Sequence, residues 1–311
     1  MKPALSVIFF TTLSGLGYGL AFWLSLDWFL APERAGAAWF GGAGMAAAIV
    51  LIVAGLLSST LHLGRPERAW RAFSQWRTSW LSREGVAAVV SMPVLALIWL
   101  GWVIGASGAL WTILALLGAL LAIATVYCTG MIYQSLKPIA AWTSKLTTLV
   151  YLLYAAMTGA FAAAALASWF GFFGGVQIAV AILLAGMLLF AKIAYWRRAA
   201  GARGLTPEDA TGLGRIGRVR QLEAPHQTDN YITREMGFRV ARRHAEKLRL
   251  IATGVGMALP ALLGAVAIAT GGAAPALLTA AAAAALVGAI VERWLFFAEA
   301  RHAVTAFYGA R

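Results

Sequence analysis

The stretch SSTLHLGRPERAWRAFSQWRTSWLSREG, residues 58–85, is polar and aromatic and lies between two long apolar segments. His62 lies where the first apolar segment ends, and Glu84 lies where the second begins. Five arginines and three tryptophans fill the interval: Arg65, Arg68, Arg71, Arg77 and Arg83, with Trp70, Trp76 and Trp80. Two apolar segments joined in this way predict two membrane helices whose ends share one face of the bilayer.

A histidine and a carboxyl beside apolar helix ends are typical of a site for a hydrophobic ligand whose polar head gains or loses protons. A quinone is such a ligand, bound by His62, Glu84, Arg65, Arg71 and Trp80 in this prediction. His62 has an alternative as an interfacial histidine at a helix end. Glu84 has an alternative as a partner of the helix dipole, with Ser82 as the N-cap.

Composition places the whole chain in a membrane. Of its 311 residues, 61% are hydrophobic and 12% are charged, and the mean hydropathy is +0.78, whereas soluble domains carry about 25% charged residues. Apolar segments of about 20 residues are long enough to cross a bilayer. We place eight of them at 4–26, 38–61, 85–105, 109–131, 146–169, 174–194, 250–270 and 274–298. The predicted fold is an all-α bundle of eight transmembrane helices in one integral membrane domain, residues 1–311.

The distribution of charge predicts the orientation. With eight spans, both termini share one face, and that face carries all of the 25 lysines and arginines except Arg34. By the positive-inside rule, both termini and the 58–85 stretch face the cytoplasm of a bacterial inner membrane. The formal charge of +13 therefore serves orientation, lipid contact and partner docking, and a nucleic-acid partner is not expected.

The connection over residues 195–249 is long and basic, and we expect it in the cytoplasm. Within it, apolar residues recur at multiples of four from Ile232 to Leu248, which predicts an amphipathic surface helix over about residues 231–249. Its polar face carries Arg239, Arg242, Arg243 and Lys247, which we expect to seat a partner subunit.

Several other residues have two readings each. Tyr127 and Tyr133 are candidate donors to a quinone carbonyl or ordinary buried tyrosines, and the tryptophans of the 58–85 stretch also fit an interfacial belt. Glu292 and Arg293 are adjacent on a helix, so they are expected to point apart and find separate partners. Cys128 is the one cysteine, which excludes an iron–sulfur cluster held by four cysteines of this chain.

Three sequence motifs are similar to those of a known family: HLGRP at 62–66 with AW at 69–70, SWLSRE at 79–84, and TREMGFRVARRHAEKLR at 233–249. They resemble the membrane anchor subunit of dimethyl sulfoxide reductase and its relatives in molybdenum oxidoreductase complexes. The resemblance implies eight membrane helices and a quinone site that includes His62 and Glu84. It also implies an iron–sulfur partner subunit and a catalytic subunit that carries molybdopterin.

The predicted role is therefore a membrane anchor, non-catalytic for the molybdenum chemistry, that passes electrons between the iron–sulfur partner and ubiquinone or menaquinone. A cytoplasm-facing arrangement resembles the sulfite-oxidising complexes of this type. The alternative within the family is the anchor of a quinol-oxidising reductase of the dimethyl sulfoxide type.

Two alternatives belong to other classes. A dihaem cytochrome b needs paired histidines within the spans, but of the four histidines His226, His244 and His302 lie outside the predicted spans. A single haem b held by histidines at span ends stays open. A secondary transporter typically has broken or charged segments near the midplane and two related halves, and the sequence displays neither.

Overall fold

The computed structural model describes residues 3–31, 34, 37–61, 63–172, 174–202, 204–220, 222–223, 244–271 and 274–307. Within these ranges, eight helical segments are long and apolar enough to cross a membrane, which confirms the predicted all-α membrane fold. Helices are the expected solution because a bilayer offers no water to satisfy backbone groups. The segments are α1 (Leu5–Leu30), α3 (Ala38–Thr60), α4 (Trp80–Val103), α5 (Ala109–Gln134), α6 (Lys145–Trp169), α7 (Gly175–Gly201), the seventh span Ala245–Ala269 and α13 (Pro275–Ala298).

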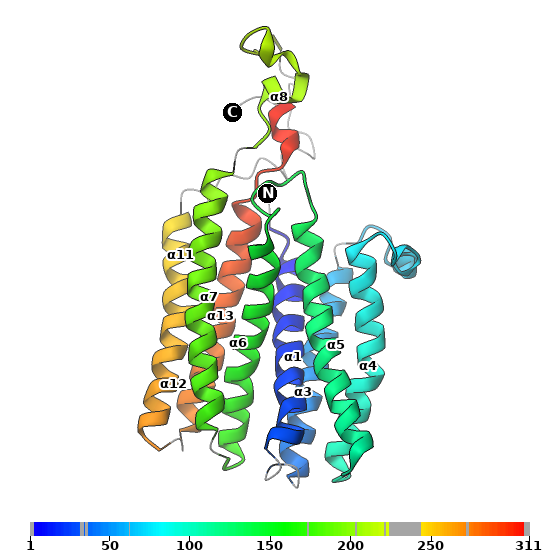
Figure 1. Ribbon diagram of the computed structural model, residues 1–311, viewed down its shortest axis with the longest axis vertical. Coiled ribbons are helices and arrows are strands. Elements are labelled where there is room, and N and C mark those ends of the chain that lie inside the picture. The colour runs from blue at the N-terminus through cyan, green and yellow to red at the C-terminus, as the bar shows by residue number, and fades with distance from the viewer. Residues whose placement is uncertain are drawn as a thin grey trace.

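The bundle consists of two halves that follow each other along the chain (Figure 1). In the first half, α1, α3, α4 and α5 pack against one another. In the second, α6 packs on α7 and α13, and the seventh span packs on both of these. Contacts of α1 and α5 with α6 join the halves, and α1 and α6 are the most buried of the eight segments.

Small residues allow the central helices to approach closely. A Cβ atom at Gly19 of α1 would overlap the carbonyl group of Ala155 on α6, and one at Gly159 would overlap the backbone of Gly19. In the second half, Gly256 and Gly288 meet in the same way. Contacts between helix backbones therefore determine how the two halves fit together.

The seventh span is not a regular α-helix. It consists of α11 (Ala245–Thr253), the π-helical turn η3 (Gly254–Ala258) and α12 (Leu259–Ala269). The irregular turn ends two residues before Pro260, which has no N–H to donate to the preceding turn. The change in hydrogen bonding therefore lies within the turn that the missing N–H of the proline affects.

Several helices extend further at the basic end than their apolar lengths predict. The third span begins at Trp80 rather than at 85, and the sixth ends at Gly201 rather than at 194. The seventh begins at Ala245, so residues 245–249 belong to a membrane helix and not to the predicted surface helix. Residues 224–243, which hold most of that predicted helix, lie outside the described residues.

The N-terminus, the C-terminal segment and the short helices gather at one end of the bundle (Figure 1). These short helices are η1 (Pro66–Gln75), α8 (Pro207–Thr211), η2 (Leu213–Arg215) and η4 (Ala303–Phe307). We call this end the basic face. At the opposite end, the ion pair of Arg34 Nη1 with Asp27 Oδ2, at 2.9 Å, is largely buried. The one basic residue assigned to that end is thus neutralised, which sharpens the charge asymmetry.

Candidate functional site

Glu84 lies in the second turn of α4, near the basic face, and is 4% exposed. Its carboxyl oxygen Oε1 is hydrogen-bonded to the hydroxyl of Thr129 on α5. That hydroxyl also lies 3.1 Å from the Thr125 carbonyl oxygen. Among the described residues, no lysine or arginine lies within ion-pair distance of Glu84. A hydroxyl on the neighbouring helix is therefore the polar anchor of this carboxyl.

The hydroxyl of Thr129 has one proton and two oxygen atoms within reach. When Glu84 is ionised, the Thr129 hydroxyl donates its proton to either the Glu84 carboxylate or the Thr125 carbonyl, but not to both at once. When Glu84 is protonated, its own O–H donates to Thr129 and the Thr129 hydroxyl donates to the Thr125 carbonyl. The arrangement accommodates both protonation states of the carboxyl without moving a helix, as a group that exchanges protons requires.

The geometry contradicts the alternative reading of Glu84 as a partner of the helix dipole. The N-cap of α4 is Ser79, whose side chain accepts a hydrogen bond from the backbone N–H of Ser82 at 3.5 Å. Ser82 is thus the donor at this cap and not the capping residue. The helix dipole acts mainly within the first turn, and Glu84 lies beyond that turn. Its side chain contacts another helix.

A second polar contact lies deeper in the same half of the bundle. The hydroxyl of Tyr18 on α1 lies 3.0 Å from Oγ of Ser91, which is two turns beyond Glu84 on α4. Tyr18, Thr125 and Thr129 are absent from the sequence-based predictions. Threonines in membrane helices commonly bond their own i−4 carbonyl, so sequence alone offers no signal that one of them meets a carboxyl.

An aromatic edge lies beside Glu84 at the surface of α4 and α5. The rings of Trp80 and Tyr127 meet edge to face with centroids 5.9 Å apart. Tyr127 is 41% exposed, and the Arg83 guanidinium lies 4.3 Å from the Trp80 ring centroid. Tyr133, in contrast, is buried in a stack with Tyr151. Of the two tyrosines predicted as donors, only Tyr127 is accessible from outside the bundle.

The arginines of η1 and its flanks are exposed. Arg65 precedes η1, and the Arg71 guanidinium lies 5.7 Å from the ring centroid of its neighbour Trp70. Neither arginine makes a hydrogen bond or ion pair with Glu84 within the described part of the chain. Phe73 of η1 contacts this region, because its ring packs on Gly85. The roles of Arg65 and Arg71 in binding a quinone stay predictions.

Several predicted site residues cannot be placed. His62, Arg239, Arg242 and Arg243 lie outside the described residues. Lys247, the fourth predicted docking residue, is exposed in the first turn of α11. Two positions further along that helix, Arg249 Nη2 forms an ion pair with Glu299 Oε1 at 2.6 Å.

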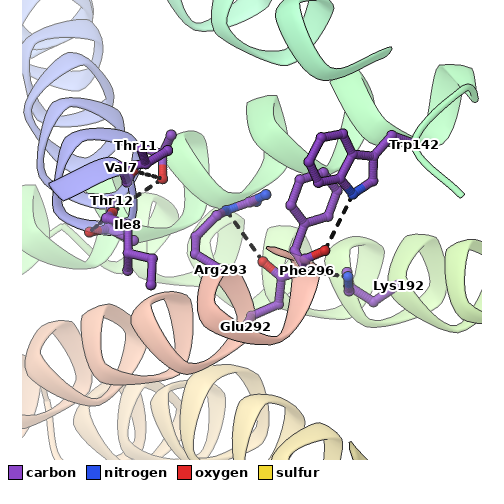
Figure 2. A network of polar contacts seen from close by, with 9 residues as sticks. All are labelled: Val7, Ile8, Thr11, Thr12, Trp142, Lys192, Glu292, Arg293 and Phe296. Carbon is purple, nitrogen blue, oxygen red and sulfur yellow. Dashed lines mark hydrogen bonds and ion pairs between the residues drawn. The ribbon is translucent and has the colours of Figure 1, made fainter. Parts of the chain in front are cut away.

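A second charged group lies inside the other half of the bundle. Lys192 of α7 and Glu292 of α13 form a fully buried ion pair, and Arg293 Nε lies 3.3 Å from Glu292 Oε2 (Figure 2). The expectation that Glu292 and Arg293 do not pair is therefore wrong, because the arginine side chain is long enough to turn back. Lys192 and Arg293, counted above with the basic face, lie inside the protein.

The described residues contain no group of three or more His, Cys, Asp and Glu side chains placed to hold a metal ion. His244 is exposed before α11, and His302 follows α13, where its Nδ1 accepts the backbone N–H of Val304 at 3.1 Å. Neither of these two histidines lies within α11, α12 or α13, whereas an axial haem ligand of a cytochrome b lies within a membrane helix.

Eight spans, a basic face and a buried carboxyl near that face define a polytopic membrane protein with an ionisable site beside an exposed aromatic edge. The chain belongs to the family of the DMSO reductase anchor subunit (DmsC), which it matches over residues 1–309. It is 34% identical to one of the subunits of the sulfite dehydrogenase of Allochromatium vinosum, over 99% of both chains. It is also 31% identical to the anaerobic dimethyl sulfoxide reductase chain YnfH of Escherichia coli, over 38% of this chain and 41% of that one.

Proposed function

We propose that this chain is the membrane anchor and quinone-binding subunit of a sulfite-oxidising molybdenum complex. In this role, an iron–sulfur partner subunit delivers two electrons from the oxidation of sulfite to sulfate, and a quinone takes them up with two protons. The similarity along the whole chain to a sulfite dehydrogenase component supports the choice of sulfite.

The observation that carries the quinone assignment is the buried Glu84. Its carboxyl is hydrogen-bonded to Thr129 and lies one turn from Trp80, at the edge formed with Tyr127. A quinone dissolved in the bilayer reaches such an edge from the side, with its ring against the aromatic residues and its oxygen atoms toward polar groups. Glu84 then supplies one proton to the reduced quinone. His62, which the sequence predicts at the same membrane face, supplies the second.

The basic face is the proposed docking surface for the iron–sulfur subunit. The N-terminus, η1, α8 and η4 lie at this end of the bundle. Because positive charge is retained in the cytoplasm, the partner subunits lie in the cytoplasm as well. Molybdopterin and iron–sulfur clusters belong to those partners, and the protein lies in the bacterial inner membrane.

Purification of the intact complex through a tag on this chain tests the proposal. We expect an iron–sulfur subunit and a molybdopterin subunit to co-purify, and sulfite to reduce a short-chain quinone added to the complex. Omission of sulfite is the control. Failure of the complex to oxidise sulfite with quinone as acceptor would contradict the proposal. An absorption spectrum of the same sample tests the haem alternative, because reduced haem b has a distinct visible band.

A second candidate is the anchor of a reductase that oxidises quinol, favoured by the match to YnfH. The same carboxyl would then accept a proton from quinol rather than donate one. Dimethyl sulfoxide reduction with a quinol donor, in the absence of sulfite oxidation, would support this candidate.

A further inference from the structure

A small cavity lies between the two halves of the bundle, where α1, α5, α6 and α13 meet. Its volume is about 20 Å³. A water molecule needs roughly 10–15 Å³ of such space, whereas a pocket for a larger organic ligand occupies about 300–1,000 Å³. The cavity is therefore suited to water and too small for a quinone ring.

The cavity is lined by hydrogen-bonding groups from both halves. Thr129, Tyr154 and Arg293 are among its lining residues. Among the described residues, the Arg293 atoms Nη1 and Nη2 and the Tyr154 hydroxyl have no hydrogen-bond partner, although all three are buried. Buried donors are almost always bonded, so these groups require acceptors, and a water in the cavity is one acceptor of the right size.

Two basic side chains share one carboxylate next to the cavity. Glu292 pairs with both Lys192 and Arg293. The Arg293 guanidinium also lies 3.7 Å from the centroid of the Tyr151 ring, which lines the cavity and holds the guanidinium in place. Glu292 is thus divided between two basic groups, and Arg293 is the one of the three that lines the cavity.

Thr129 connects this charge to Glu84, because it lines the cavity and is hydrogen-bonded to the Glu84 carboxyl. We propose that Arg293 is a positioning residue for proton transfer, which stabilises the Glu84 carboxylate through a water in the cavity. The inference rests on the proposed quinone function. When Glu84 protonates the reduced quinone, its O–H bond breaks and an O–H bond forms on the quinone oxygen. The resulting carboxylate is balanced by Arg293 until a proton from solvent restores the carboxyl.

The variant Arg293→Gln tests this role in the intact complex. Because general acid–base assistance contributes about 10²–10⁴-fold, we expect kcat for quinone reduction to fall at least about tenfold. We expect the quinone KM and the activity with an artificial dye at the partner's active site to stay at the wild-type level. Arg293→Lys keeps the charge and should restore most of the rate. Wild-type kcat in Arg293→Gln would overturn the inference.

Infrared difference spectra between oxidised and reduced complex supply a readout besides turnover. The carboxyl band that Glu84→Gln removes identifies Glu84, and we expect Arg293→Gln to diminish the redox-linked change in that band while Arg293→Lys retains it. An unchanged band in Arg293→Gln would assign Arg293 to packing alone. Absence of quinone reduction by the wild-type complex would instead contradict the proposed function.

A milder variant keeps the test decisive if Arg293→Gln does not assemble. Tyr154→Phe removes the unpartnered hydroxyl of a residue that lines the cavity and keeps the ring. We expect a lower kcat and a larger solvent isotope effect on quinone reduction, because water in the cavity loses one of its partners. Tyr195→Phe is the matched control, because Tyr195 is buried beside Lys192 but does not line the cavity. Equal behaviour of Tyr154→Phe and Tyr195→Phe would overturn the role of the cavity.

Discussion

Glu84 on α4 and Thr129 on α5 are hydrogen-bonded inside the bundle, although 45 positions separate them in the sequence. Glu84 is predicted from the sequence as a site residue, whereas Thr129 is not. The partner of the Glu84 carboxyl is neutral and not a cation. Among the residues that the structure describes, no ion pair therefore holds Glu84 in its ionised form.

The first prediction concerns the titrating proton of Glu84. Glu84→Gln keeps a hydrogen bond to Thr129 but cannot exchange a proton, so quinone reduction should fall by about 10²-fold or more. Quinone KM and dye activity of the complex should stay near wild type. Thr129→Val is a companion variant that removes the partner and retains the carboxyl, and its defect should be smaller. A Glu84→Gln complex with wild-type quinone turnover would remove Glu84 from the proton path.

The second prediction concerns His62. His62→Ala should leave the complex assembled, because one side chain at a helix end contributes little to bundle packing, and should abolish electron exchange with quinone. Quinone activity and dye activity are measured on the same preparation. If both match the wild type, His62 is an interfacial residue without a role at the site.

The third prediction concerns the buried charges of the second half. Glu292→Gln leaves Lys192 and Arg293 without a counter-charge, which should destabilise the protein by about 3–5 kcal/mol. Lys192→Met should cost less, because Glu292 keeps Arg293 as its partner at 3.3 Å. Thermal inactivation in detergent measures which of the two variants is less stable. A Lys192→Met variant as unstable as Glu292→Gln would contradict the role of Glu292 as the carboxylate shared by Lys192 and Arg293.

The fourth prediction concerns the docking of the iron–sulfur partner. Arg242→Glu combined with Arg243→Glu should release the partner at moderate salt, where surface ion pairs are already weakened by screening. The control reverses Arg215 and Arg218, two exposed arginines of the same connection outside the predicted docking helix. Co-purification at increasing salt measures retention. Equal retention in both double variants would exclude the predicted helix as the specific docking element.

The fifth prediction concerns orientation. A reporter enzyme that is active only in the periplasm should give no signal when fused after Arg311, because the basic face is expected in the cytoplasm. The same reporter inserted at Gly105, in the turn between α4 and α5 at the opposite end, should be active. The reverse pattern would invert the topology and favour a reductase with catalytic subunits outside the membrane.

The sequence by itself determined the class of the protein, the eight spans and the position of Glu84 near the basic face. These are local properties: the length of an apolar segment decides whether it spans the bilayer, and the charges beside it decide its preferred orientation. Helix ends were less well predicted, because α4 and α7 remain helical beyond their apolar lengths.

Only the tertiary structure decided what the polar residues inside the bundle contact. Thr129 reaches Glu84, and Lys192 reaches Glu292 across a separation of 100 positions, because glycine contacts such as that of Gly19 with Gly159 set which helix faces meet. No periodicity of a single segment encodes that choice. Packing between segments distant in the sequence brings Thr129 and Arg293 to one cavity, and apolar length and charge count are insensitive to such packing.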